Sequence, residues 1–374
     1  MRVVQLADVV NRHDFIDVIV DHLDADAFDV RVATFGVPSN IADPGFAGRG
    51  VETINIHAEV GRRSYPGALF RLRSYLTRER IDVVHCHHFD PALLAWMATR
   101  LAPTRLVVGR HYSDAIHLSA SGARRSAYLA LERRVHRAAA AVVVPSRMIA
   151  DMVSAIGVRP ERVHVIPYAF TAAKYAGAGS TDRVQLHTSL ALPADAFVIG
   201  TFARLYRDKG HRYLLRAVRV LADELPSLRW VIVGDGAERA GLERSVAELD
   251  LHEVVRFTGW RRDAMAMMEC VDVVVQPTLQ EAFSSVMGEA MWLRRPLVIT
   301  DVSGATDIID DNVNGVLVPK RDPEALADAI RTLALDRGLA SRLGAAGHAF
   351  VTTELTPERV VPQYGRVYER ALAD

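Results

Sequence analysis

The amino-acid sequence predicts an α/β protein with two doubly wound parallel sheets. From the first residue onward, short apolar runs alternate with helix-like segments, and such a series implies parallel strands joined by crossover helices. The series breaks at residues 172–181, which are small and typical of a linker, and then it resumes. A length of 374 residues is sufficient for two domains, each with a core of its own.

The N-terminal domain is expected to span residues 1–170 and to be Rossmann-like. Its strand-like runs lie at residues 3–6, 28–34, 51–56, 83–85, 106–108, 141–145 and 164–167. The helix-like segments between them lie at residues 14–23, 69–79, 91–100, 125–137 and 148–156.

The second Rossmann-like domain is expected at residues 185–356, after a linker over residues 171–184. Its strand-like runs lie at residues 197–201, 228–233, 254–258, 271–275, 297–300 and 315–318. The last segment, residues 357–374, is predicted to be helical because apolar side chains such as Val360, Tyr364 and Val367 recur at helical spacing. The residues alone do not indicate which of the two domains this helix packs on.

Composition and charge indicate a globular protein of the cytoplasm. Hydrophobic residues make up 50% of the chain and the formal net charge is zero, so the overall charge does not attract nucleic acid. Cys86 and Cys270 fall in apolar segments of different halves, as expected of reduced cytosolic thiols. The chain starts with a strand-like run rather than a signal peptide, and no stretch approaches the roughly 18 apolar residues of a membrane span.

Positive charge is concentrated in the N-terminal half. Residues 60–150 contain 15 Lys and Arg against 5 Asp and Glu. Within this region, residues 66–80 are expected to form a helix in which Phe70 and leucines are surrounded by arginines. We expect this helix to pack on its own sheet, with peripheral contact with an anionic membrane as the alternative. The sequence does not indicate an oligomeric state.

The stretch that carries most of the predicted chemistry is residues 276–291. It follows a strand-like run and opens a helix for which Ser284 and Ser285 are available as N-caps. Free N–H groups and the helix dipole make such a helix start an anion site. Glu281 precedes the first turn and Glu289 lies one turn inside, so both carboxylates can accept hydrogen bonds from the hydroxyls of one ligand. A phosphate attached to sugars fits this pattern.

Two cations follow the first strand of the second domain. Arg204 and Lys209 come after residues 197–201, at the carboxyl end of the strand, where open α/β sheets bind their ligands. Positive charge at this position suits a diphosphate.

Together these residues resemble the retaining glycosyltransferases of family 4, which have the GT-B fold: two Rossmann-like domains facing across a cleft. The family's two glutamates, with seven residues between them, match Glu281 and Glu289, and Phe283 is in its usual place. The family's arginine and lysine–glycine pair match Arg204 and Lys209. Further matches at residues 234–236, 257–260, 295–301 and 314–318 extend the resemblance over nearly the whole chain.

The resemblance implies roles in donor binding for the second domain and acceptor binding for the first. Arg204 and Lys209 hold the diphosphate, Glu281 binds hydroxyls of the transferred sugar, and Glu289 holds the ribose. The other implied donor contacts are the backbone of Phe283, Ser284, Ser285 and Val286 for phosphate, and Gly234, Thr258 and Arg261 for the base. The resemblance also implies that the closing helix, residues 357–374, crosses back to pack on the N-terminal domain.

His111 is the predicted catalytic residue of the first domain, alongside Arg204, Lys209 and Glu281 of the second. It follows the strand-like run 106–108, where the family places a histidine near the donor sugar and the acceptor. A neutral imidazole there positions the sugar or the attacking hydroxyl.

The loop after the first strand departs from the family because it lacks the usual paired glycines. Arg12 and His13 are predicted to bind the acceptor in their place. Tyr168 also departs from the family, because an asparagine–glycine turn usually follows this strand.

No metal site is predicted. His85, Cys86, His87 and His88 are metal-ligand types, but alternation along a strand sends His85 and His87 to one face and the other two to the opposite face. Arg204 and Lys209 supply the positive charge that a divalent cation would otherwise bring, so metal-independent chemistry is expected.

We therefore predict a retaining glycosyltransferase that moves a sugar from a nucleotide-diphosphate sugar, with UDP slightly favoured, to an acceptor hydroxyl. The acceptor is a saccharide, a lipid-linked molecule or a small molecule, and the enzyme is cytoplasmic or peripheral at the inner face of the membrane. One alternative is a nucleotide-sugar 2-epimerase of the same architecture, which converts its donor without an acceptor. The other is a non-catalytic nucleotide or sugar binder, which binds without turnover.

Overall fold

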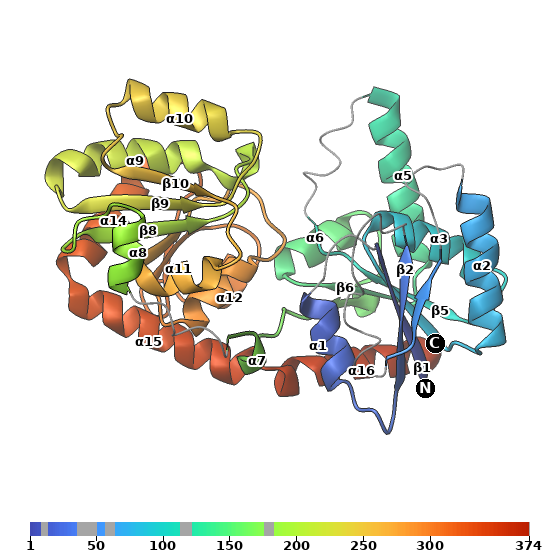
Figure 1. Cartoon of the computed structure of the whole chain (residues 1–374). Helices are drawn as coiled ribbons and strands as arrows, with labels where there is room; N and C mark the ends of the chain where they lie inside the picture. Colours follow the sequence, from blue (N-terminus) through green and yellow to red (C-terminus); the bar gives the residue numbers. More distant parts are fainter. Residues whose placement is uncertain (9–13, 36–50, 57–63, 113–121, 176–182, 374) are drawn as a thin grey trace. The chain divides into compact units, whose positions relative to one another are not determined.

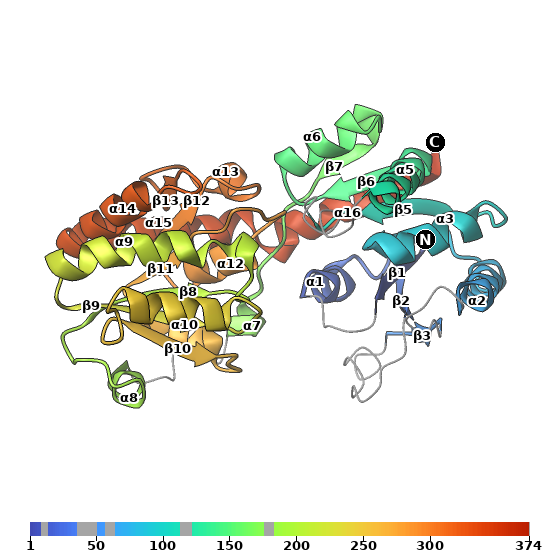
Figure 2. The same cartoon turned by 90° about the horizontal axis from the view of Figure 1, so that it is seen from above.

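The computed structural model describes residues 1–8, 14–35, 51–56, 64–112, 122–175 and 183–373. The chain divides into two compact units: unit 1 is Met1–Ala169 with Pro357–Asp374, and unit 2 is Phe170–Thr356. Each unit contains one parallel sheet with helices on both faces (Figures 1 and 2). The predicted fold class, two Rossmann-like doubly wound domains, is confirmed.

The described residues of unit 1 form a seven-stranded sheet in the order β3-β2-β1-β4-β5-β6-β7. Its strands are β1 (Arg2–Asp8), β2 (Asp29–Phe35), β3 (Thr53–Asn55), β4 (Val83–His87), β5 (Arg105–Gly109), β6 (Ala141–Val144) and β7 (Val163–Val165). All neighbouring pairs are parallel. The strand order reverses between β1 and β4, and ligands of such sheets bind at the carboxyl ends of the strands at this switch point.

The last helix of the chain contributes to the core of unit 1. The helices of this unit are α1 (Asp14–His22), α2 (Tyr65–Arg78), α3 (Phe89–Thr99), α5 (Gly122–Ala138), α6 (Arg147–Ala155), α16 (Pro357–Ala373) and the 3-10 helix η3 (Pro160–Arg162). Tyr364, Val367 and Tyr368 of α16 are buried in one cluster with Ile19 of α1 and Val83 of β4. The helical spacing of these side chains therefore serves the sheet of unit 1.

Helix α2 packs into unit 1 through its leucines. Leu72 and Leu76 are fully buried, whereas Phe70 is 72% exposed. One face of α2 is therefore buried within unit 1, where α3 is its neighbour, and both packing on the sheet and peripheral contact with an anionic membrane stay predictions. Among the helices of the described residues, none is long and apolar enough to cross a membrane.

The described residues of unit 2 form a six-stranded sheet in the order β10-β9-β8-β11-β12-β13. Its strands are β8 (Phe197–Phe202), β9 (Leu228–Val233), β10 (Val255–Gly259), β11 (Val273–Gln276), β12 (Leu297–Thr300) and β13 (Val316–Val318). All neighbouring pairs are again parallel. Here the strand order reverses between β8 and β11, so the loops after these two strands form the switch point.

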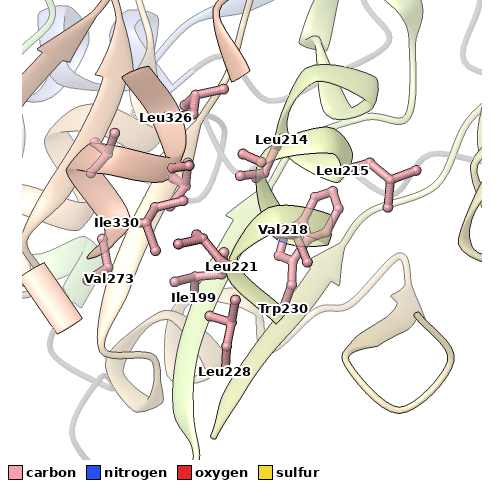
Figure 3. Packing of buried hydrophobic residues seen from close by; sticks show 14 of the residues in the cluster. Ile199, Leu214, Leu215, Val218, Leu221, Leu228, Trp230, Val273, Leu326 and Ile330 are labelled. Carbon is pink, nitrogen blue, oxygen red and sulfur yellow. The ribbon is translucent and has the colours of Figure 1, made fainter. Parts of the chain in front are cut away.

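Helices cover both faces of this sheet, and a cluster of buried apolar side chains lies under α9 and α14. The helices of unit 2 are α7 (Ala172–Tyr175), α8 (Arg183–Ser189), η4 (Arg207–Lys209), α9 (His211–Glu224), α10 (Arg239–Glu248), α11 (Ala264–Cys270), α12 (Ser285–Trp292), α13 (Ala305–Ile308), α14 (Pro323–Leu335) and α15 (Arg337–Glu354). Figure 3 shows Leu214 and Leu221 of α9 and Ile330 of α14 facing the strand residues Ile199 and Trp230. This core supports the strands whose carboxyl ends carry the predicted site.

The predicted linker over residues 171–184 is in part helical. Helix α7 occupies its beginning, and Tyr175 is buried and stacks on Trp292 with ring centroids 4.9 Å apart. The sequence analysis did not predict this helix, which forms because small residues such as Ala172 are good helix formers and Tyr175 anchors them to α12. Residues 176–182 lie outside the described residues.

Candidate functional site

The switch point of unit 2 brings Lys209 and Glu281 together. Lys209 ends the 3-10 helix after β8, and Glu281 lies in the loop after β11. The Lys209 Nζ and Glu281 Oε2 atoms are 3.0 Å apart, in a pair that is largely shielded from solvent. Two residues predicted from separate motifs, 72 positions apart in sequence, are therefore direct partners.

The two loops that carry this pair are fixed to each other by backbone contacts. The Leu279 N–H donates to the Asp208 carbonyl at 2.7 Å. Gly210 adopts φ +70°, and a Cβ there would come within 1.9 Å of the Pro277 carbonyl oxygen. Only glycine allows this approach, and this is the physical reason why a glycine follows Lys209.

The electrostatic surroundings of Glu281 combine burial with two cations. Burial raises the pKa of Glu281, while the charges of Lys209 and Arg204 act in the opposite direction. Arg204 is exposed, and its guanidinium lies over the Tyr206 ring, 5.0 Å from the centroid. A carboxylate paired with one cation and influenced by a second suits a ligand that carries both negative charge and hydroxyl groups.

Helix α12 begins beside Glu281 with the expected N-cap. The Ser284 hydroxyl accepts a hydrogen bond from the Met287 N–H at 3.3 Å, so the capping prediction is confirmed for Ser284, whereas Ser285 is the first helical residue. Phe283 is buried, and the neighbouring loop approaches it closely, since a Cβ on Gly304 would lie 3.1 Å from the Phe283 Cα. Val286 is partly buried in the first turn.

Glu289 faces a cation that the sequence analysis missed. Its Oε1 atom accepts a hydrogen bond from Lys174 Nζ of α7 at 2.8 Å. Lys174 lies in the segment predicted as a linker, 115 residues away, and no motif marks it. The pair holds one carboxylate oxygen of Glu289.

Two of the three residues predicted near the base, Gly234 and Thr258, lie at neighbouring strand ends. Gly234 donates its N–H to the Gly259 carbonyl at 2.9 Å, and a Cβ there would meet the Ala203 carbonyl oxygen at 1.9 Å. The Thr258 hydroxyl donates to the Ile232 carbonyl at 3.2 Å.

Arg261 lies beyond them and forms an ion pair with Asp263 at 2.6 Å. Its side chain is 41% exposed, so this pair contributes little to stability.

In unit 1, His111 is partly buried at the carboxyl end of β5. Its Nδ1 atom is 3.0 Å from the Tyr168 hydroxyl, and its Nε2 atom is 3.0 Å from His87 Nδ1. The Phe15 ring stacks on it with centroids 4.2 Å apart. Sequence analysis treated Tyr168 only as a departure from the family and did not identify Phe15, because neither carries a motif of its own.

The remaining predictions for unit 1 have different outcomes. Arg12 and His13 lie outside the described residues. His85 and His87 share one face of β4, as strand alternation predicts, with ring centroids 4.2 Å apart. Within the described ranges, no group of three or more His, Cys, Asp or Glu side chains is arranged to hold a metal ion.

Both halves of the chain are similar in sequence to known glycosyl transferases. Residues 196–336 match the sequence model of "Glycosyl transferases group 1", and residues 15–169 match that of "Glycosyl transferase 4-like domain". The chain is 30% identical over 331 residues to D-inositol 3-phosphate glycosyltransferase 1 of Catenulispora acidiphila, covering 80% of this chain and 77% of the relative. It is 31% identical over 219 residues to the lipopolysaccharide core biosynthesis glycosyltransferase LpsE of Rhizobium meliloti, covering 58% of this chain and 60% of the relative.

Solved structures show the same fold. Anabaena HepE in complex with UDP-glucose superimposes with a TM-score of 0.81 at 20% identity, over 99% of both chains. Sucrose-phosphate synthase of Thermosynechococcus elongatus superimposes with a TM-score of 0.80 at 20% identity, over 100% of both chains. With both halves matched by family models and the GT-B fold shared, the chain belongs to the group 1 (family 4) glycosyl transferases.

Proposed function

We propose that this protein is a retaining glycosyltransferase that moves a sugar from a nucleotide-diphosphate sugar to an acceptor hydroxyl. The observation that carries the proposal is the Lys209–Glu281 pair, 3.0 Å apart at the switch point of unit 2 and next to the start of α12. A bound diphosphate would compete for Lys209 and leave Glu281 to the sugar hydroxyls. Cations and helix N–H groups aimed at a leaving diphosphate stabilise the charge that develops on it.

Each part of the proposed donor has its own binding residues. Arg204 and Lys209 hold the diphosphate, and the backbone N–H groups at the start of α12 contribute further donors. Glu289, with one oxygen held by Lys174, keeps the other for the ribose hydroxyls. These cations supply the positive charge for the reaction, so we expect transfer to persist in the presence of a chelator.

UDP-sugars are the first donors to test. HepE was solved with UDP-glucose, and several relatives are named as glycosyltransferases acting on lipopolysaccharide core or inositol 3-phosphate. A phosphorylated or saccharide acceptor would suit the basic N-terminal half, where residues 60–150 carry 15 Lys and Arg against 5 Asp and Glu. We place acceptor binding in unit 1, with His111 as the residue that positions the reacting hydroxyl.

Thermal shift with UDP, GDP, ADP, TDP and their common sugars tests the donor assignment. A ligand at about 100 times its Kd should stabilise the folded protein by roughly 2.7 kcal/mol. We expect one nucleotide to give a selective shift that Lys209→Ala abolishes. Arg219→Ala is the matched control, because it removes an exposed ion pair of the same unit, 2.9 Å long, without touching the proposed site.

Product analysis then separates the proposed reaction from its alternatives. NMR of the product should show the donor's anomeric configuration retained. Conversion of the donor without an acceptor would favour a 2-epimerase, and binding without any turnover would favour a non-catalytic binder. Absence of a shift with every nucleotide would contradict the donor assignment.

A further inference from the structure

Six polar side chains of unit 1 form a continuous chain of hydrogen bonds that reaches from the core to His111. Its members come from β1, β4, α16 and the loops after β5 and β7: Gln5, His85, His87, Tyr368, His111 and Tyr168. We call this set the histidine chain. Gln5, His85, His87 and Tyr368 are fully buried, and His111 and Tyr168 are partly buried. A buried polar group is retained only where its hydrogen bonds are made, so the arrangement constrains every member.

The distances leave no gap in the outer half of this chain. The Tyr168 hydroxyl lies 3.0 Å from His111 Nδ1, His111 Nε2 lies 3.0 Å from His87 Nδ1, and His87 Nε2 lies 2.9 Å from Gln5 Oε1. The inner half continues from Gln5 Nε2 to the Tyr368 hydroxyl at 3.0 Å, and from that hydroxyl to His85 Nδ1 at 2.9 Å. All five contacts are within hydrogen-bond range.

The Gln5 amide fixes the direction of the outer half. A carbonyl oxygen only accepts, so His87 must carry its proton on Nε2. In its neutral form the imidazole of His87 has a single N–H, so its Nδ1 is an acceptor. His111 must therefore donate from Nε2, which leaves its Nδ1 as the acceptor of the Tyr168 hydroxyl.

The hydrogen bonds of the inner half run from Gln5 to His85. The Gln5 NH2 group donates to the Tyr368 hydroxyl, which in turn donates its own proton to His85 Nδ1. Burial lowers the pKa of His85 to about 3, so this imidazole is neutral, and with Nδ1 as the acceptor its hydrogen is on Nε2, which has no hydrogen-bond partner among the described residues. Tyr368 thus supplies the hydrogen-bond partner of the Gln5 NH2 group.

We propose that Gln5 and Tyr368 are positioning residues for transfer, because they hold His111 in the Nε2–H tautomer with Nδ1 as a hydrogen-bond acceptor for a reacting hydroxyl. The substrate hydroxyl takes the place that Tyr168 occupies. In this tautomer His111 orients a hydroxyl that donates to it and offers no N–H of its own at Nδ1. The inference rests on the proposed role of His111, and it gives α16 a function in the site of unit 1 beyond packing.

Nitrogen-15 NMR of histidine ring nitrogens tests the tautomers directly. In the wild-type protein, we expect His87 and His111 both to show a protonated Nε2 and an unprotonated Nδ1. Gln5→Met keeps the length of the side chain but removes both hydrogen-bonding groups, so both histidines should become tautomer mixtures. We expect the loss of this hydrogen-bond partner to lower kcat about 10-fold, with the donor KM changed less than about twofold.

Tyr368→Phe and Tyr364→Phe provide a matched pair in case Gln5→Met does not fold. Both tyrosines are buried on α16, one helical turn apart, but only the Tyr368 hydroxyl belongs to the histidine chain. We expect Tyr368→Phe to mix the tautomers and lower kcat, and Tyr364→Phe to leave both unchanged.

Two results would overturn the inference: a protonated Nδ1 on His111 of the wild-type protein, which would mean that the Gln5 amide has the opposite orientation, or unchanged tautomers in both Gln5→Met and Tyr368→Phe. The NMR measurement needs no substrate. A protein with the expected tautomers that transfers no sugar would refute the proposed function and not this assignment.

Discussion

The two units carry sites of opposite electrostatic character at equivalent positions of similar sheets. In unit 2, the switch point between β8 and β11 holds charged groups, with Lys209 paired to Glu281 and Lys174 paired to Glu289. In unit 1, the residues at β1, β4 and β5 are imidazoles, hydroxyls and an amide in the histidine chain.

This difference matches the chemistry of the two proposed ligands. A diphosphate is charged and needs cations whose own charge is balanced while the site is empty. An acceptor hydroxyl is neutral and needs a hydrogen-bond partner of fixed direction. The same strand order therefore supports two kinds of recognition, and the side chains at the strand ends decide which.

Replacing each glutamate of the charged site with glutamine should separate the roles of the two residues. We expect Glu281→Gln to lower kcat/KM for transfer by about 100-fold with little change in nucleotide affinity, because hydrogen bonds from sugar hydroxyls to a carboxylate are worth about 1.5–3 kcal/mol. Glu289→Gln should mainly weaken nucleotide binding, by about 10-fold. Calorimetry with the nucleotide and with the nucleotide sugar would measure both, and the reverse order would show that the two roles are exchanged.

A substitution at Gly109 should disrupt the histidine chain most strongly. A Cβ at this position would lie 2.6 Å from His111 Nε2 and 3.0 Å from both His87 Nδ1 and His85 Nε2. Gly109→Ala should therefore separate the three imidazoles, lower kcat strongly and reduce the free energy of unfolding by about 1–3 kcal/mol. Gly67→Ala in α2 is the control, because its Cβ would meet only the end of the Arg71 side chain at 3.3 Å. Equal stability of the two variants would show that a Cβ at position 109 does not crowd the three imidazoles.

Acid should weaken unit 1 through His85. The pKa of His85 is lowered by burial to about 3, below its ordinary value of 6.5, so the unfolded chain takes up a proton more readily than the folded one. The stability that this group contributes is complete above pH 6.5 and is lost as the pH falls toward 3, by about 2 kcal/mol between pH 7 and pH 5.

Hydrogen exchange of the β4 amides at these two pH values would measure the loss. His85→Asn should show a smaller loss than the wild-type protein. Identical losses would mean that His85 is not the group that takes up the proton.

The smallest expected effect is at Lys174, which positions Glu289 from a partly exposed site. Lys174→Met keeps the aliphatic stem and removes the charge, so nucleotide affinity should fall about fivefold, equivalent to roughly 1 kcal/mol for such an ion pair. Lys320→Met is the control, since Lys320 is also partly exposed and its Nζ lies 3.9 Å from Asp301. An unchanged affinity in Lys174→Met would show that Glu289 needs no positioning by α7.

Much of the fold was accessible from local patterns. The apolar run at residues 297–300 coincides with β12, and the run at 197–201 differs from β8 by one residue, because the alternation of buried strands and amphipathic helices is encoded within each short segment. The N-cap at Ser284 was equally local, since its partner is three residues away. The small residues after Phe170 did not predict α7, because composition alone does not reveal a short helix anchored by Tyr175.

The sequence by itself determined the two parallel sheets and the types of residue at their strand ends, because periodicity and strand-end position are properties of neighbouring residues. Only the tertiary structure decided which of them meet. Lys174 reaches Glu289 across 115 residues, and Tyr368 reaches His85 across 283, through the packing of α7 and α16 onto their units. The physical reason is that hydrogen bonds and ion pairs depend on distances of about 3 Å, which strand order and helix packing set and which no local pattern contains.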